Sequence, residues 1–346
     1  MSAEPPLPTW WVDTDAGIDD AQALFVLLRA QELGKLRIAG ISCSHGNVPL
    51  AHVVGNVCAV LASFSCPLAS RVPVYVGADA PLCARSTSAA EWHGSDGLGE
   101  SGAGAAAPRA QVVEGEPGAA ALLRVARAWG GLSVLTLGPL TNLALAVRLS
   151  NGELPRLLSR VVVMGGAWTG HGNVTPAAEF NVLEDPEAAA AVFSCAWACG
   201  LDLVTWELTR AHGASPPCVA RWLQAGGASP RAAFLERVSK YLIAKTESFN
   251  PEAFRALGFF APDPLAAAVA VAPELVEDAF TKGVLVETAG RWGRGQTVVD
   301  WNAAHPAEAP PCVRIIKRVH QGAFEALLVD SVGGAGGAGG AAAVPQ

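Results

Sequence analysis

The chain has 346 residues, of which 51% are hydrophobic and only 16% are charged, so it is long and apolar enough to bury a large core. No apolar stretch reaches the roughly 18 uninterrupted residues of a membrane-spanning helix, so we expect no membrane partner. The formal net charge of −7 argues against nucleic acid as a partner, and the N-terminus lacks the basic and apolar segments of a signal peptide, which predicts a cytoplasmic protein.

The first predicted strand includes Trp10 to Val12 and leads into a stretch with four aspartates, which an apolar helical pattern follows. These aspartates are Asp13, Asp15, Asp19 and Asp20. Carboxylates this close repel one another and raise each other's pKa, and a hard divalent cation removes that conflict. Ligands that are all oxygen favour Ca²⁺ or Mg²⁺ over zinc. A polar turn with aspartate caps is the alternative interpretation, but a cap needs one aspartate and not four.

Predicted strands and helices then alternate along the chain. The strands cover residues 36–43, 72–77, 132–137, 160–164 and 200–206, and the helices cover residues 50–62, 119–129 and 216–248, the last with a break at 226–230. This alternation predicts an α/β fold: an open, mostly parallel sheet with helices on both faces, in a single domain over residues 1–330. The Gly- and Ala-rich segments 102–107 and 331–346 are predicted to be disordered.

In an open parallel sheet, ligands bind beyond the carboxyl ends of the strands. The aspartate stretch, Leu137, Met164 and Asp263 are all predicted to fall just after strands. The sequence therefore predicts that segments far apart in the chain converge on one crevice.

The aspartate stretch reads Asp-x-Asp-x-Gly-x-Asp-Asp, which resembles the N-terminal signature of the nucleoside hydrolase family, of the inosine-uridine-preferring type. Further segments are similar to that family as far as about residue 303. They are Asn47 after the second strand, His-Gly-x-Asp-Gly-Leu-Gly at 93–99, Gly-Pro-Leu-Thr-Asn at 138–142, Met-Gly-Gly at 164–166, Gly-Asn-Val-Thr-Pro-Ala-Ala-Glu-Phe-Asn at 172–181 and Asp-x-Leu-Ala at 263–266.

The resemblance implies a Rossmann-like nucleoside hydrolase fold and Ca²⁺-dependent hydrolysis of the N-glycosidic bond of ribonucleosides, in purine salvage and nucleoside catabolism. It also implies a homodimer or homotetramer with a nucleoside as substrate. The implied metal ligands are Asp15, Asp20, Asp263 and the carbonyl of Leu137, and Asp15 is also the implied base that takes a proton from water. The implied substrate-binding residues are Asp13, which also orients its loop, Asp19, Asn47, Met164, Asn173, Glu179 and Asn181.

The segment around Asp263 departs from the family at one position. In many members a His precedes this Asp and protonates the leaving base, and here that position is Pro262. His93 and Trp92 are the candidates that replace this His, His93 by donating a proton and Trp92 by stacking on the base. Both routes suit purines better than pyrimidines, so we predict a preference for purine nucleosides.

Two other functions fit part of this pattern. A protein that keeps the metal and the ribose contacts but turns over weakly would be a nucleoside-binding protein, because Pro262 has no proton to donate. A phosphatase with Asp13 as nucleophile would need Thr or Val two residues after Asp15 and a later Gly-Asp-x-x-x-Asp motif. Residue 17 is Gly and no such motif follows, so the sequence favours nucleoside hydrolysis.

Overall fold

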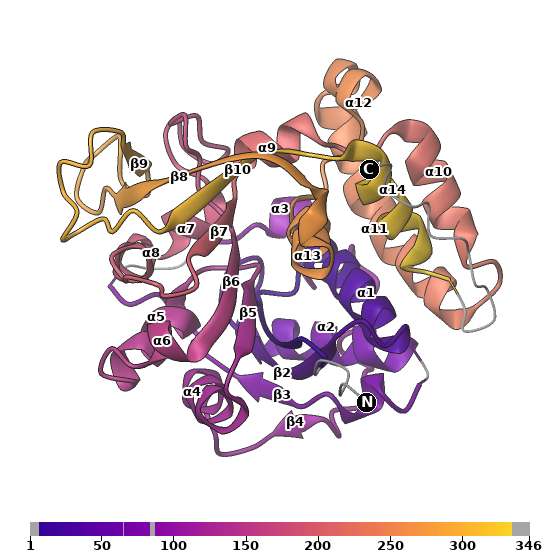
Figure 1. The fold of residues 1–346 in the computed structure, drawn as a ribbon. Helices are drawn as coiled ribbons and strands as arrows, with labels where there is room; N and C mark the ends of the chain where they lie inside the picture. Colours follow the sequence, from indigo (N-terminus) through magenta and orange to yellow (C-terminus); the bar gives the residue numbers. More distant parts are fainter. Residues whose placement is uncertain (1–6, 65, 84–86, 334–346) are drawn as a thin grey trace, which may run out of the picture.

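The computed structural model describes residues 7–64, 66–83 and 87–333, and a ten-stranded sheet forms the centre of this part of the chain (Figure 1). The strand order is β4-β3-β2-β1-β5-β6-β7-β10-β8-β9. The strands are β1 (Thr9–Thr14), β2 (Arg37–Cys43), β3 (Val74–Val76), β4 (Val112–Val113), β5 (Leu132–Thr136), β6 (Leu158–Met164), β7 (Leu201–Val204), β8 (Val276–Val286), β9 (Thr297–Asp300) and β10 (Val313–Val319). Neighbours from β4 to β10 pair in parallel, whereas β8 is antiparallel to both β10 and β9.

Helices cover both faces of the sheet (Figure 1). Those of ten residues or more are α1 (Ile18–Glu32), α2 (Leu50–Ser63), α4 (Gly118–Trp129), α10 (Pro216–Ala225), α11 (Pro230–Phe249), α13 (Pro262–Val271) and α14 (Gln321–Asp330). The shorter ones are α3 (Ala90–His93), α5 (Thr141–Leu149), α6 (Leu154–Leu157), α7 (Phe180–Glu184), α8 (Pro186–Phe193), α9 (Trp206–Ala211), α12 (Pro251–Leu257) and the 3₁₀ turns η1 (Ala69–Arg71) and η2 (Pro273–Leu275).

Strand β1 lies in the middle of the sheet, and all six of its residues are buried. Successive side chains of a strand point to opposite faces, so a strand that is covered on both faces is apolar along its whole length. Trp10 and Val12 accordingly pack into the core that α1 and α13 share, and Trp11 packs into the core under α4 and α5. Both faces of β1 are covered by helices. Its polar residues therefore lie at the end of the sheet where the carboxyl ends of the parallel strands meet.

The architecture confirms the predicted α/β fold, with an open, mostly parallel sheet and helices on both faces. Two predicted boundaries were wrong. The strand predicted at 200–206 ends at Val204, and Trp206 already begins α9. Asp263 does not follow a strand of the sheet but lies in the first turn of α13, where a proline at the start pre-organises the helix.

Strands β8 and β10 and helix α14 were not predicted. In β8 most residues are only half-buried, so its apolar residues do not form the continuous run that marks a central strand. Residues 102–107 were predicted to be disordered, but they form a turn in which the backbone of Gly104 packs closely against Asn56. Ser331 and Val332 are buried, so the packed chain extends past the predicted boundary at residue 330. Residues 334–346 of the predicted tail lie outside the described residues.

Among the described residues, no helix combines the length and the apolar character that a transmembrane span requires.

Candidate active site

The predicted site residues come from segments that are far apart in sequence and close in space. Asp13 and Asp15 lie at the carboxyl end of β1, and Asp19 and Asp20 lie in the first turn of α1. Asp263, in the first turn of α13, has a carboxylate oxygen within 4.8 Å of oxygens of both Asp19 and Asp20. The amino ends of α1 and α13 therefore meet. Their helix dipoles stabilise negatively charged side chains such as these carboxylates.

Asp13 is held by one donor from strand β2 and one from helix α5. Its Oδ2 accepts hydrogen bonds from the Ser42 hydroxyl and from Asn142 Nδ2, the latter at 2.8 Å. Trp11 Nε1 in turn donates to Ser42 Oγ at 2.8 Å. Burial raises the pKa of Asp13 to about 7 even though these two donors lower it. These two hydrogen bonds fix the position of the Asp13 carboxylate, and its role in orienting the loop stays a prediction.

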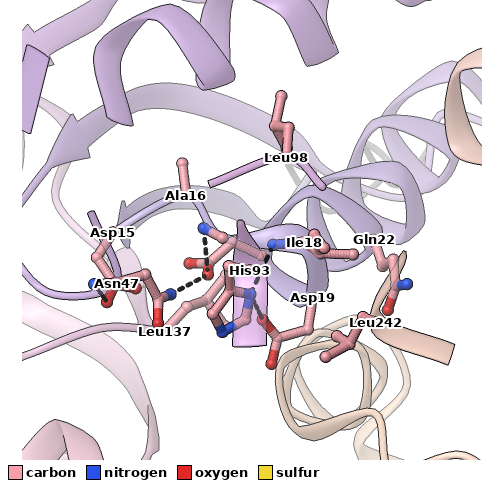
Figure 2. Close-up of polar contacts among 12 residues, drawn as sticks. Asp15, Ala16, Ile18, Asp19, Gln22, Asn47, His93, Leu98, Leu137 and Leu242 are labelled. Atoms are coloured by element: carbon pink, nitrogen blue, oxygen red, sulfur yellow. Dashed lines mark hydrogen bonds and ion pairs between the residues drawn. The ribbon is translucent and has the colours of Figure 1, made fainter. Parts of the chain in front are cut away.

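Asp15 is enclosed by backbone. The N–H of Asn47 donates to its Oδ2 at 2.8 Å, as Figure 2 shows. Gly46 and Gly138 lie so close on either side that a Cβ on either residue would overlap the Asp15 carboxylate. Ala16, which follows, has a φ of +33°, and this sharp turn takes the chain from β1 into α1. Burial, and then the charge of Asp20, raise the pKa of Asp15 well above its usual range.

Asp20 organises the turn between β1 and α1. It accepts hydrogen bonds from the Thr14 hydroxyl, from the N–H of Gly17 at 2.9 Å and from Asn47 Nδ2 at 3.1 Å. These donors hold its carboxylate against that of Asp263, whose pKa is raised well above its usual range by burial and then by the charges of Asp19 and Asp20. Asn47 thus contacts two aspartates, where the sequence predicted a substrate contact.

A divalent cation fits this arrangement of residues. The Oδ1 atoms of Asp13, Asp15 and Asp19 are buried and accept no hydrogen bond. None of the ion pairs found among the described residues joins an aspartate of this site to a lysine or an arginine. Buried carboxylates without partners are strongly unfavourable unless a positive charge compensates them. The oxygen-only donor set therefore suits a hard cation such as Ca²⁺.

His93 reaches the amino end of α1 from α3. The N–H of Ile18 donates to its Nδ1 at 3.0 Å, and the same Nδ1 lies 3.7 Å from Asp19 Oδ1 (Figure 2). Because Nδ1 accepts a hydrogen bond, the neutral ring carries its proton on Nε2. Burial lowers the pKa of His93 to about 4 although the charge of Asp20 opposes this. His93 is consequently neutral at pH 7, and the only proton that it can offer to a base is the one on Nε2.

Trp92 lies beside His93 and is half-buried. Its ring meets the edge of Phe249, with centroids 5.1 Å apart, and Lys245 Nζ lies 5.7 Å from its centre. Phe249 is 71% exposed, so this pair joins α3 to the end of α11 at the protein surface. Trp222 is fully buried and donates to Ser331 Oγ, so it belongs to the core and cannot stack on a base.

The residues predicted to hold the sugar divide into two groups. Asn181 Nδ2 donates to the carbonyl of Leu137 at 2.7 Å and to that of Met164 at 3.2 Å, which ties together the ends of β5 and β6. Glu179 is buried and accepts from three backbone N–H groups, one of them that of Gly166 at 2.8 Å. Burial raises its pKa to about 7.

Asn173 belongs to the other group, because it is exposed and caps the N–H of Phe180 at 2.9 Å. The loop that carries it is held by Glu207, which accepts from the N–H of Trp168 and from the N–H and hydroxyl of Thr169.

Sequence reasoning missed several residues that build the site. Ser42 and Asn142 hold Asp13, and Thr14 holds Asp20. Asn142 belongs to the Gly-Pro-Leu-Thr-Asn segment, in which no role in the site was predicted for the Asn side chain. The signal that was available is its position directly after a buried strand, which is where the other site residues also lie.

Without a cation, we expect the protein to lose stability as the pH rises from 6.5 to 8.5. Folding raises the pKa of Asp13 to about 7 and that of Asp19 to about 8, in both cases mainly through burial. A raised carboxyl pKa contributes stability at low pH, and this stability is lost as the pH rises through the folded-state value. At about 1.4 kcal/mol per pH unit, the two groups together lose about 2–3 kcal/mol over this range.

Melting curves in chelator at the two pH values measure this loss, and starting at pH 6.5 keeps the titration of histidines small. Added Ca²⁺ should stabilise the protein more at pH 8.5 than at pH 6.5, and Asp13→Asn should flatten the pH dependence. A metal-free protein that melts at an equal or higher temperature at pH 8.5 would contradict the electrostatics of the site.

Comparison with known proteins places this geometry among enzymes. The profile of the family described as "Inosine-uridine preferring nucleoside hydrolase" matches residues 10–326. The chain is 32% identical over 318 residues to "Probable uridine nucleosidase 2" of Oryza sativa subsp. japonica, with 85% of the chain and 84% of the relative covered. It is also 32% identical to the "Pyrimidine-specific ribonucleoside hydrolase RihA" of Salmonella agona, with 84% and 88% covered. A solved structure of an "Inosine-Guanosine Nucleoside Hydrolase (IG-NH)" superposes with a TM-score of 0.80 and 28% identity, over 94% of this chain and 98% of that one.

Proposed function

Because the chain belongs to the inosine-uridine preferring nucleoside hydrolase family, and is thus a nucleoside hydrolase that acts on ribonucleosides, we propose that it uses Ca²⁺ and prefers purine nucleosides. The observation that carries the Ca²⁺ proposal is the group of buried carboxylates that lacks cationic partners, together with the three unpaired oxygens of Asp13, Asp15 and Asp19. Oxygen ligands on flexible carboxylates suit Ca²⁺, which takes roughly 6–8 of them.

The metal ligands proposed are Asp15, Asp20, Asp263 and the Leu137 carbonyl. The three side chains whose carboxylate oxygens lie within 4.8 Å of one another are Asp19, Asp20 and Asp263, and in this proposal Asp19 lies beside the ion and contacts the ribose. Bound Ca²⁺ would supply positive charge that makes a nearby water molecule more acidic and attracts the ribose hydroxyls. The Leu137 carbonyl already accepts from Asn181, but an oxygen with two lone pairs can serve both.

Asp15 accepts the proton of the attacking water in this proposal. The water oxygen bonds to C1′ of the ribose, the bond from C1′ to the base nitrogen breaks, and the base leaves with the bonding electrons and takes up a proton. The anionic oxygens of the site stabilise the positive charge that develops on the sugar. Asp15 suits this role because backbone on both sides fixes its carboxylate, while its Oδ1 accepts no hydrogen bond.

The ribose hydroxyls would be bound by Asp19 and by Asn181, and the 5′ hydroxyl by Asn173 and Glu179. Both N–H bonds of the Asn181 amide point to backbone carbonyls, so its Oδ1 is the atom that would accept from the sugar. Asn47 and Met164, which contact the aspartates and Asn181, would border the sugar from below.

The preference for purines rests on how the leaving base is protonated. Pro262 has no donor, and His93 offers only a neutral N–H on Nε2. A neutral imidazole can donate a hydrogen bond to a ring nitrogen, and an aromatic face such as that of Trp92 favours a base that becomes cationic. The related proteins named above include uridine-, pyrimidine- and purine-directed ones, so the preference is argued from these residues alone. The cytoplasmic location, the role in salvage and the homodimer or homotetramer stay predictions.

Release of reducing sugar from a panel of nucleosides, with Ca²⁺ and with chelator, tests this function. We expect release from inosine or guanosine to exceed that from uridine and to stop in chelator. Nucleoside binding without release would favour the weakly active binding protein instead. Faster release from uridine would reject the purine preference and leave the hydrolase activity standing.

Trp92→Ala should lower kcat for inosine about tenfold or more and should barely change turnover of nitrophenyl riboside, whose leaving group needs no protonation. A variant that only bound the ribose more weakly would turn over both inosine and nitrophenyl riboside more slowly. A loss on inosine alone therefore identifies activation of the leaving group. Trp129→Ala is the matched control, because Trp129 is also half-exposed but stacks on Arg37 elsewhere on the surface. Equal losses on both substrates would reject the role of Trp92.

A further inference from the structure

A second buried polar cluster lies behind the aspartates and is not part of the mechanism above. His45 is 2% exposed, and its Nε2 lies 2.9 Å from the hydroxyl oxygen of Thr141. That hydroxyl donates to Asp185 Oδ2 at 2.7 Å. Because a hydroxyl has a single proton, Thr141 must accept from His45, which therefore carries its proton on Nε2.

Asp185 is itself fixed by backbone. Its Oδ2 accepts from the N–H of Leu82 at 2.9 Å, and its Oδ1 caps α8 by accepting from the N–H of Ala188 at 3.0 Å. On the other side of the imidazole, Glu184 Oε2 lies 3.9 Å from His45 Nδ1. The His45 ring thus lies between Thr141 and the junction of α7 and α8.

Both ends of this cluster continue directly into the site. His45 precedes Gly46, whose backbone lies against the Asp15 carboxylate, and Asn47, whose N–H donates to Asp15. Thr141 precedes Asn142, whose side chain donates to Asp13 at 2.8 Å. A shift of the His45 loop would move both the Gly46 backbone, which packs against the Asp15 carboxylate, and the Asn47 N–H, which donates to it. Gly46 has a φ of +149°, and a glycine backbone changes conformation easily. Gly46 alone would therefore not prevent such a shift.

We propose that the His45–Thr141–Asp185 cluster is a positioning device that holds the Gly46–Asn47 backbone against Asp15. None of its three side chains needs to touch substrate or metal for this role. The inference rests on the proposed function of Asp15 as the base. A group outside the reaction can have a large effect on rate, because misplacing a catalytic group by about 1 Å can lower the rate about a hundredfold.

The matched variants Thr141→Val and Thr141→Ser test the proposal. Valine keeps the shape of threonine but removes the hydroxyl that links His45 to Asp185, whereas serine keeps the hydroxyl. With saturating Ca²⁺ we expect Thr141→Val to lower kcat about 10–100-fold with KM changed less than about twofold, and Thr141→Ser to restore most of the rate. A merely structural role would lower the melting temperature and leave kcat of the folded enzyme unchanged.

His45→Gln and His45→Asn form a second pair in case Thr141→Val does not fold. The longer glutamine amide reaches the position of Nε2 and should retain activity, whereas asparagine is too short and should lose it. Combining His45→Asn with Thr141→Val should lower kcat little further, because both break the same contact. A kcat within about twofold of wild type in both Thr141→Val and His45→Asn would overturn the proposal.

Calorimetric Ca²⁺ affinity separates this inference from the proposed function. If wild type releases no ribose from any nucleoside, the proposed function fails, and the affinity still reports on Asp15. In that case Thr141→Val should bind Ca²⁺ at least about tenfold more weakly than Thr141→Ser, in line with other residues that orient metal ligands. Equal affinities of the two variants would overturn the positioning role.

Discussion

Asp263→Ala is expected to abolish both Ca²⁺ binding and nucleoside hydrolysis. Asp263 is one of the three carboxylates that lie within 4.8 Å of one another, and the only one of them that α1 does not supply. Without it this group loses the carboxylate that α13 contributes, and only the two from α1 remain. A bound metal ion typically lowers the activation free energy by several kcal/mol. Its loss therefore corresponds to a fall in rate of about 10³-fold or more. Asp20→Asn should have a similar effect, and its amide oxygen can still accept from the N–H of Gly17.

Titration calorimetry with Ca²⁺ and sugar release from inosine measure the two losses separately. Asp278→Asn is the control, since this carboxylate pairs with Lys317 on the surface and should leave both readouts unchanged. In chelator Asp263→Ala should melt no lower than wild type, because it removes one of several carboxylates that repel one another. Unchanged Ca²⁺ affinity in both Asp263→Ala and Asp20→Asn would show that the metal lies elsewhere.

The aspartate stretch was predictable because its evidence is local. Four carboxylates between a strand and a helix already conflict electrostatically in the sequence, and the structure places Asp19 and Asp20 in the first turn of α1. The central parallel strands were predictable for a similar reason, since burial on both faces makes each a short apolar run. The half-exposed strand β8 gives no such signal, and it was missed.

The environment of each side chain was not predictable, because it depends on which loops meet. Nothing in the sequence around His93 indicates that its Nδ1 accepts from Ile18, a contact between residues 75 positions apart. That contact and the burial fix the proton of the neutral ring on Nε2 and lower the pKa of His93 to about 4, which the sequence does not indicate. The link from His45 to Thr141 similarly spans 96 positions and appears only once β2 and β5 are placed in the sheet.

Asp15→Asn is expected to leave the protein folded, able to bind ribose and nearly inactive. Removing a general base lowers rates about 10²–10⁴-fold, and a disturbed metal ligand would add to that loss. The fold should persist because the asparagine amide oxygen can still accept from the N–H of Asn47 at the position of Oδ2. The variant also removes a buried charge that has no cationic partner among the described residues, which by itself favours folding.

Initial rates of sugar release and the competitive inhibition constant of ribose, both in saturating Ca²⁺, distinguish the two roles of Asp15. If it is the base, kcat falls while ribose inhibits at nearly the wild-type concentration. If it serves only the metal, the Ca²⁺ and ribose affinities fall together and extra Ca²⁺ recovers the rate. Asn142→Ala is an informative companion, because it removes one of the two donors to Asp13 and leaves the contacts of Asp15 intact. Turnover by Asp15→Asn within about tenfold of wild type, which is less than the loss of a general base produces, would exclude Asp15 as the proton acceptor.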